Sequence, residues 1–75
     1  MNKSNSYIVQ AVLFDNEIYT TNQARQWLKS HNYEPLKRVH KTDKYLRYRI
    51  QIPQAKSKYV VKSLNNGDIK LILMK

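Results

Sequence analysis

Residues 44–52 alternate between apolar and polar side chains, and this segment constrains the fold more than any other part of the chain. The apolar set is Leu46, Tyr48, Ile50 and Ile52, and the other set is Tyr45, Arg47, Arg49 and Gln51. A period of two predicts a β-strand with one buried and one exposed face. The exposed set carries aromatic, guanidinium and amide groups, which commonly contact nucleic acids, so we expect the functional site there.

The length of the chain limits it to one domain. A chain of 75 residues buries roughly 60% of its unfolded surface and is too small to enclose a deep catalytic cavity. Hydrophobic residues make up 41% of the sequence and aromatic residues 11%, which is enough for a core. We therefore expect a single basic α+β domain over residues 7–75, preceded by a mainly polar, disordered N-terminus at residues 1–6.

The chain carries a large excess of positive charge. There are 14 Lys and Arg residues against five Asp and Glu, which gives a net charge of +9 and a pI near 10.0. This balance is typical of proteins that bind polyanions, because each phosphate that a cation neutralises releases condensed counterions. The alternative is that the charge only keeps the protein soluble, although a small domain rarely needs a net charge above about 8 for that purpose.

The residues that catalysis or metal binding would need are absent or scattered. The chain has no Cys and a single Gly, and neither histidine belongs to a recognisable metal motif. The acidic residues, which a metal-dependent nuclease would need in a cluster, are spread through predicted turns; they are Asp15, Glu17, Glu34, Asp43 and Asp68. We therefore expect no enzyme activity, no metal, no cofactor and no small-molecule substrate.

The sequence also lacks the features of a secreted or membrane protein. The absence of Cys is compatible with a reducing compartment, and no apolar run of signal-peptide or membrane-spanning length is present. We therefore expect an intracellular protein with no membrane partner.

The first half of the chain predicts a strand followed by a helix. Residues 7–14 are apolar on both alternations, which favours a central strand. Thr20 followed by Gln23 has the form of a capping box, which starts a helix. The stripe that would pack on a sheet consists of Ala24, Trp27, Leu28 and His31. We expect Trp27 in the core and His31 at the helix end.

The second half predicts two hairpins. Residues 36–42 form a weak second strand that pairs with residues 44–52 across a turn near Thr42 and Asp43, and Pro53 ends the pairing. Strands at residues 58–64 and 68–74 are joined by Asn65, Asn66 and Gly67, which tolerate positive φ. Both faces of the last strand are apolar, so we expect either that both faces are buried within the protein or that one of them contacts another subunit.

The element order β-α-β-β-β predicts the fold class. We expect an α+β sandwich of two layers, with one short helix on a mostly antiparallel sheet of four or five strands. One helix covers one face of such a sheet. The other face is then left to solvent, to a ligand or to a dimer partner.

Many residues along the chain match the pattern of a known viral domain. They are Tyr19-Thr20, Ala24, Trp27-Leu28-Lys29, His31, Tyr33, Lys37, Lys41-Thr42, Tyr45, Arg47-Tyr48-Arg49, Pro53 and Asn65-Asn66-Gly67. The chain thus resembles, over nearly its whole length, a small basic domain of giant viruses, virophages of the Zamilon type and phages. The resemblance implies DNA binding and a host-cell location in the viral replication compartment, with the virion as a second location that the sequence leaves open. The chain departs from the family pattern after the triplet Arg47-Tyr48-Arg49. A Gln commonly follows this triplet, whereas this chain has Ile50 there and Gln51 one position later.

Two arginines are the leading candidates for the binding site. Arg47 and Arg49 lie two positions apart on one predicted strand, so their side chains project about 6 to 7 Å apart, near the spacing of successive phosphates. A guanidinium fork can bind a phosphate bidentately or contact the O6 and N7 edge of guanine. The alternatives are a solvated strand face or pairing with Glu34 or Asp43.

Other cations and one tyrosine complete the predicted nucleic-acid site. The added residues are Tyr45, Lys37, Arg38, Lys41, Lys44, Lys56 and Lys58. Tyr45 could stack on a base, whereas Tyr48 belongs to the apolar set and is expected in the core. Because consecutive strand residues point to opposite faces, only a subset of these cations can meet one ligand. The others would be solvated residues that guard a sheet edge.

We therefore predict a viral DNA-binding protein that contacts the phosphate backbone with little sequence specificity. Double-stranded DNA is the expected partner, because few aromatic residues fall on the exposed face. The alternative is a structural or adaptor protein that forms a homodimer or docks an acidic viral protein, using the last strand and an exposed sheet edge.

Overall fold

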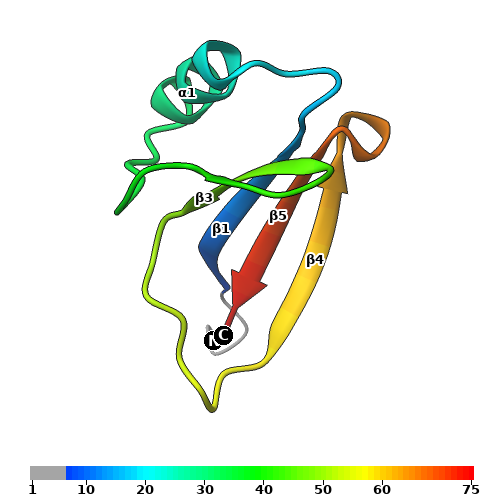
Figure 1. Cartoon of the computed structure of the whole chain (residues 1–75). Coiled ribbons are helices and arrows are strands. Elements are labelled where there is room, and N and C mark those ends of the chain that lie inside the picture. Colours follow the sequence, from blue (N-terminus) through cyan, green and yellow to red (C-terminus); the bar gives the residue numbers. More distant parts are fainter. Residues whose placement is uncertain (1–6) are drawn as a thin grey trace.

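The computed structural model describes residues 7–75 and shows one helix packed on one sheet (Figure 1). The elements are β1 (Ile8–Asp15), α1 (Thr21–Ser30), β2 (His40–Lys41), β3 (Tyr45–Arg49), β4 (Tyr59–Leu64), the 3-10 turn η1 (Asn65–Gly67) and β5 (Ile69–Met74). The strand order is β2-β3-β1-β5-β4, and every neighbouring pair is antiparallel. The predicted α+β architecture is confirmed, with five strands. The prediction of disorder for residues 1–6 lies outside the described residues.

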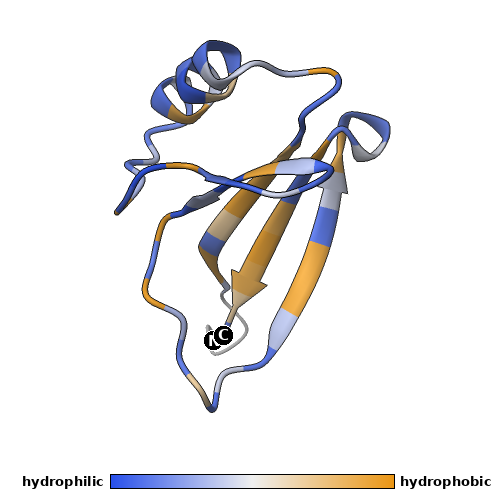
Figure 2. Cartoon of the chain, viewed as in Figure 1, coloured by the Kyte–Doolittle hydropathy of each residue, from blue (hydrophilic) through white to orange (hydrophobic). Residues whose placement is uncertain are grey.

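The two most apolar strands lie inside the sheet. β1 pairs with β3 on one side and with β5 on the other, which confirms that it is central. β5 lies between β1 and β4, and Figure 2 shows both β1 and β5 as largely hydrophobic ribbons. The interior position of β5 accounts for its two apolar faces. The two edges of the sheet belong to β2 and β4.

Helix α1 begins at the predicted capping box. The Thr20 hydroxyl accepts a hydrogen bond from the Gln23 backbone N–H, and the Gln23 side chain accepts one from the Thr20 N–H. Ala24 and Leu28 of the helix are buried. At the other end, His31 Nδ1 lies 2.8 Å from the Trp27 carbonyl oxygen, as expected for a residue that closes the helix. A helix of ten residues is too short to be stable alone, so packing on the sheet maintains it.

The core lies between α1 and one face of the sheet. It contains Val12, Phe14, Ala24, Leu28, Leu46, Tyr48, Ile50 and Ile69. The Phe14 ring makes edge-to-face contacts with Tyr19, Trp27 and Tyr48, at centroid distances of 5.4, 5.6 and 5.8 Å. Tyr48 is 3% exposed, as predicted for a core residue. Burial raises the pKa of its hydroxyl above 10.0, although the positive charge of Arg25 opposes this shift.

The β4–β5 hairpin follows the prediction from its turn residues. Asn65, Asn66 and Gly67 have φ values of 51°, 60° and 96°. Only residues that tolerate the left-handed region can make this reversal. The two strands pair without a register shift from Tyr59 opposite Met74 to Leu64 opposite Ile69.

The second predicted strand is much shorter than expected. Only His40–Lys41 pairs with β3, whereas the prediction covered residues 36–42. A single backbone hydrogen bond, from the Leu36 N–H to the Arg49 carbonyl oxygen, ties the earlier part of this segment to β3. Residues 36–39 do not alternate between apolar and polar side chains. Burial of one face therefore does not keep this segment hydrogen-bonded to β3 along its length.

The predicted strand at residues 44–52 also ends early. β3 stops at Arg49, because the Ile50 and Gln51 N–H groups both donate to the Gln10 carbonyl oxygen at 2.8 and 3.1 Å. The β1–β5 register shifts at the same point, between Val9 and Ala11. This irregularity breaks the alternation, so Ile52 is 73% exposed and does not share the buried face with Ile50.

Candidate nucleic-acid interface

The predicted polar stripe of β3 faces away from the helix. Arg47 and Arg49 pair with Leu13 and Ala11 of β1, while Leu46 and Tyr48 on the opposite face lie in the core under α1. Directly paired residues of antiparallel strands share a face. Tyr45, Arg47 and Arg49 therefore lie together on the sheet face that the helix does not cover, which we call the open face. Gln51 lies beyond the strand and does not join them.

Register brings two further basic residues to the open face. His40 of β2 pairs with Arg47, and Lys70 of β5 pairs with Leu13, which also pairs with Arg47. The sequence prediction named neither residue in the site. Their positions depend on which residues of different strands lie opposite one another, and that register is not visible within either segment alone.

A small cavity beside the sheet edge is lined only by basic residues. Its lining consists of Lys37, Arg38, His40, Arg47 and Arg49, around a volume of about 200 Å³. We call it the cation cavity. Lys37 and Arg38 lie in the irregular segment before β2, and the Leu36–Arg49 hydrogen bond holds that segment beside β3. No carboxylate lines the cavity, so the positive charges there repel one another until an anion enters.

The two β3 arginines have no acidic partner among residues 7–75. Neither Arg47 nor Arg49 makes an ion pair or a side-chain hydrogen bond there, so pairing with Glu34 or Asp43 does not occur. The Arg47 Nε atom is buried and has no hydrogen-bond partner. A buried polar group without a partner carries a free-energy cost, and because this atom is closed to solvent, a ligand could contact it only after its surroundings rearrange.

Tyr45 is held by a cation on the open face. The Lys70 Nζ atom lies over the Tyr45 ring, 5.3 Å from its centroid. This arrangement occupies one face of a ring that the sequence predicted could stack on a base. Asp15 pairs with Tyr45 at this end of the sheet and accepts a hydrogen bond from the Glu17 N–H.

Four of the predicted lysines do not line the cation cavity. Lys41 pairs with Leu46 and therefore belongs to the helix side of the sheet, and Lys44 precedes β3 in the turn. Lys56 and Lys58 lie in the connection before β4 and are exposed. Of the nine predicted site residues, the fold thus gathers five on or beside the open face; these are Lys37, Arg38, Tyr45, Arg47 and Arg49.

The open face is partly covered, contrary to the expectation that it would be bare. The connection from β3 to β4 runs past the end of the sheet (Figure 1), and Pro53, Gln54 and Ala55 line a hollow of about 490 Å³ with Arg47 and Ile72. The Tyr59 hydroxyl fixes this connection, because it donates to the Gln54 carbonyl oxygen and accepts from the Gln54 N–H. The connection therefore narrows access to Arg47 from that side, while Arg49 of β3 and Val61 of β4 stay exposed.

Other kinds of site find no support among residues 7–75. No group of three or more His, Cys, Asp or Glu side chains is placed to hold a metal ion in this part of the chain. Within the same residues, no helix combines the length and apolar character that crossing a bilayer requires. Searches against protein-family models, curated proteins and solved structures found no match to this chain. The resemblance to a viral DNA-binding domain therefore stays a prediction.

Proposed function

We propose that this protein binds the phosphate backbone of nucleic acid, with DNA as the first candidate, through the cation cavity and the adjoining open face. The observation that carries the proposal is the cavity itself. Five basic residues from two segments of the chain line it, and no acidic residue does. A phosphate supplies both the negative charge and the acceptor oxygens that this site lacks.

The geometry suits backbone contact better than base-specific contact. Arg47 and Arg49 alternate with core residues on a short strand, so packing fixes where both side chains leave the sheet. Phosphate contacts position a protein on nucleic acid and carry no sequence information, which agrees with the low specificity that we predict. We also propose the viral setting that the sequence resemblance implies.

A charge-matched pair of variants tests the proposal. We expect Arg47→Ala/Arg49→Ala to weaken binding to a labelled duplex, and to lower the slope of log affinity against log salt by about 1.8, because each lost phosphate contact contributes about 0.9. The control is Lys41→Ala/Lys62→Ala, which removes the same charge from the helix side of the sheet.

Two results of this experiment would reject the proposal. One is an equal loss in both variants, because net charge alone would then explain binding. The other is no binding by the wild-type protein to duplex DNA, single-stranded DNA or RNA at low salt.

The exposed edge of β4 favours a second candidate function, a homodimer. Among residues 7–75, β4 pairs with β5 alone, so its other edge has no strand partner in this part of the chain. Val60 and Val61 are 42% and 60% exposed, and the strand contains neither a bulge nor a proline. Natural edge strands usually carry such protection against pairing, and in β4 the charge of Lys62 is the one feature of this kind. Two copies pairing about Val61 would place each Val60 opposite the partner subunit's Lys62 and would keep the Lys62 charges apart.

The dimer is tested by placing a charge on the edge. We expect Val61→Lys to abolish self-association in sedimentation experiments at high salt, where the repulsion between two basic chains is screened. Ile52→Lys is the matched control, because Ile52 is 73% exposed but lies outside β4. A wild-type protein that stays monomeric at high concentration would exclude the dimer.

A further inference from the structure

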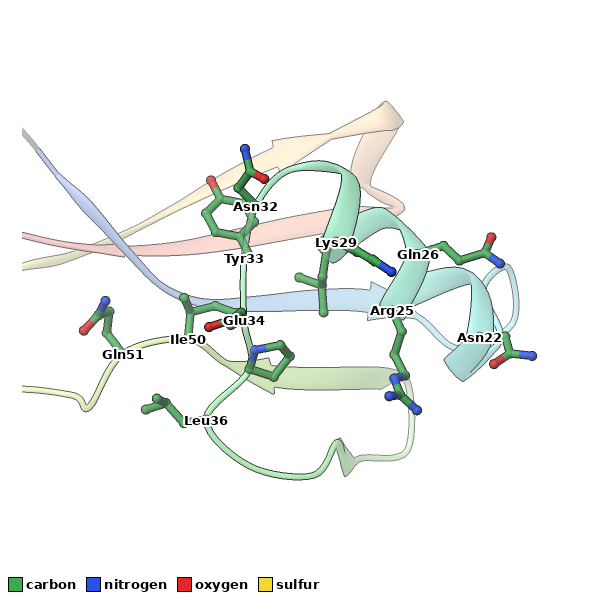
Figure 3. Close-up of a pocket in the computed structure, with 12 residues that line it drawn as sticks. Asn22, Arg25, Gln26, Lys29, Asn32, Tyr33, Glu34, Leu36, Ile50 and Gln51 are labelled. Carbon is green, nitrogen blue, oxygen red and sulfur yellow. The ribbon is translucent and has the colours of Figure 1, made fainter.

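A second depression lies on the helix side of the same sheet edge. It is a groove of about 910 Å³ between α1 and two loop segments (Figure 3). Its lining consists of Asn22, Arg25, Gln26, Leu28, Lys29, Asn32, Tyr33, Glu34, Pro35, Leu36, Ile50 and Gln51. We call it the amide groove, because four of these residues carry a primary amide. In Figure 3 the residues of α1 form one side, while Leu36, Ile50 and Gln51 form the other.

The polar groups of the amide groove are free to bind a ligand. Within residues 7–75, the side-chain amides of Asn22, Gln26, Asn32 and Gln51 make no hydrogen bond. The buried Leu28 and Ile50 give the groove an apolar component. The four amides are exposed and stand around the groove rather than converging on one point (Figure 3), so the groove is an apolar surface with a polar border.

The charges of the amide groove distinguish it from the cation cavity. Arg25 and Lys29 line it together with the carboxylate of Glu34. The carboxylate of Glu34 makes the groove less favourable to a phosphate than the cation cavity, which has no acidic lining. Amides both donate and accept hydrogen bonds, and Asn and Gln side chains match the edges of nucleobases. Tyr33 adds an aromatic ring to the same lining.

One backbone rung separates the amide groove from the cation cavity. Leu36 lines the groove and the next residue, Lys37, lines the cavity. On the neighbouring strand, Arg49 lines the cavity and Ile50 lines the groove. The Leu36 N–H to Arg49 carbonyl hydrogen bond, 2.8 Å long, joins the two boundaries. An anion site and a polar-apolar site thus lie one residue apart along the chain but on opposite faces of the sheet, so a nucleic-acid strand would reach both by passing around the edge formed by residues 36–41.

We propose that the amide groove binds an unpaired nucleobase while the cation cavity holds a phosphate of the same strand, so that the protein prefers single-stranded nucleic acid. This inference rests on the proposed nucleic-acid function. It differs from the duplex expected from the sequence, which considered the aromatic residues of the open face alone. A base inside a duplex is stacked and paired and cannot enter a groove beside a helix.

Three probes with controlled chemistry test the inference by fluorescence anisotropy. They are a 12-nucleotide single strand, an abasic strand with the same number of phosphates, and a 12-base-pair duplex. We expect the single strand to bind about tenfold more tightly than the abasic strand, since one base contact contributes about a factor of ten. The double variant Gln26→Ala/Gln51→Ala should remove this difference and leave duplex binding unchanged.

Two controls separate this inference from the proposed function. Ser63→Ala, a polar truncation on β4 away from the groove, should change nothing. A 2-aminopurine base placed in the strand should change its fluorescence on binding wild-type protein but not Gln26→Ala/Gln51→Ala. Equal binding of the normal and abasic strands would overturn the base site while leaving phosphate binding intact. No binding of any probe would overturn both proposals.

Discussion

The backbone N–H of Leu36 donates to the carbonyl oxygen of Arg49 at 2.8 Å, and this one hydrogen bond joins two different surfaces. On the open side of the sheet it holds Lys37 and Arg38 beside Arg49, where they line the cation cavity. On the helix side it holds Leu36 across from α1, where it lines the amide groove. The irregular segment before β2 therefore forms part of the lining of both surfaces.

Replacing the arginine forks with lysines should separate charge from geometry. Arg47→Lys/Arg49→Lys keeps the net charge of +9, so the salt dependence of DNA binding should stay close to that of the wild type. Affinity should fall about fivefold, because an ammonium cannot bind a phosphate bidentately. Titrations at several salt concentrations measure both quantities. An unchanged affinity would show that the guanidinium shape is irrelevant.

The start of the helix should behave as a coupled pair. Thr20→Ala should lower the free energy of unfolding by about 1 kcal/mol, because it leaves a backbone N–H of the first turn without a partner. Gln23→Ala removes the reciprocal hydrogen bond at the Thr20 N–H. Denaturation of both single variants and the double variant gives the coupling energy. Strict additivity would contradict the capping box that the structure shows.

Alkaline pH should destabilise the protein through Tyr48. Burial raises the pKa of Tyr48 above 10.0 in the folded state, so the unfolded chain loses this proton first as the pH increases. Stability is therefore fully present below pH 10.0 and declines above it. Tyr48→Phe lacks the ionisable group, and its stability should fall less steeply than that of the wild type. Urea unfolding of both proteins from about pH 8 to about pH 11 measures the difference.

The β4–β5 turn should be sensitive to substitution at one position and insensitive at the preceding one. Gly67 has a φ of 96°, and a Cβ built there would meet nothing within 4 Å, so strain in Gly67→Ala comes from the backbone alone. We expect a loss of about 1 to 2 kcal/mol in thermal or chemical unfolding. Asn66→Gly, at a φ of 60°, is the control and should be nearly neutral. Equal effects would contradict the assigned turn.

Local signals in the sequence were sufficient for much of the fold. The alternation around Arg47 located the β3 strand and its exposed face, and the Thr20–Gln23 pair located the start of the helix. Both features depend on residues close together in the chain. The Asn65–Gly67 turn was predicted correctly for the same reason, because its conformation is set by the residues within it.

Features that depend on pairing between distant segments were missed. The early end of β3 comes from the Gln10 carbonyl oxygen, which accepts from both Ile50 and Gln51 and lies far away in the sequence. The places of His40 and Lys70 beside the arginines depend on strand register. The amide groove was also missed, because its two sides come from α1 and from segments that no periodicity connects.

The two outer strands of the sheet are unequal, and this difference limits how many copies can join. β2 consists of two exposed basic residues, His40 and Lys41, whereas β4 has six residues. A molecule with one extendable side can accept a single neighbour, and the pair that results has no extendable side left. In the proposed dimer, pairing through β4 would therefore end with two copies and would not continue into a filament.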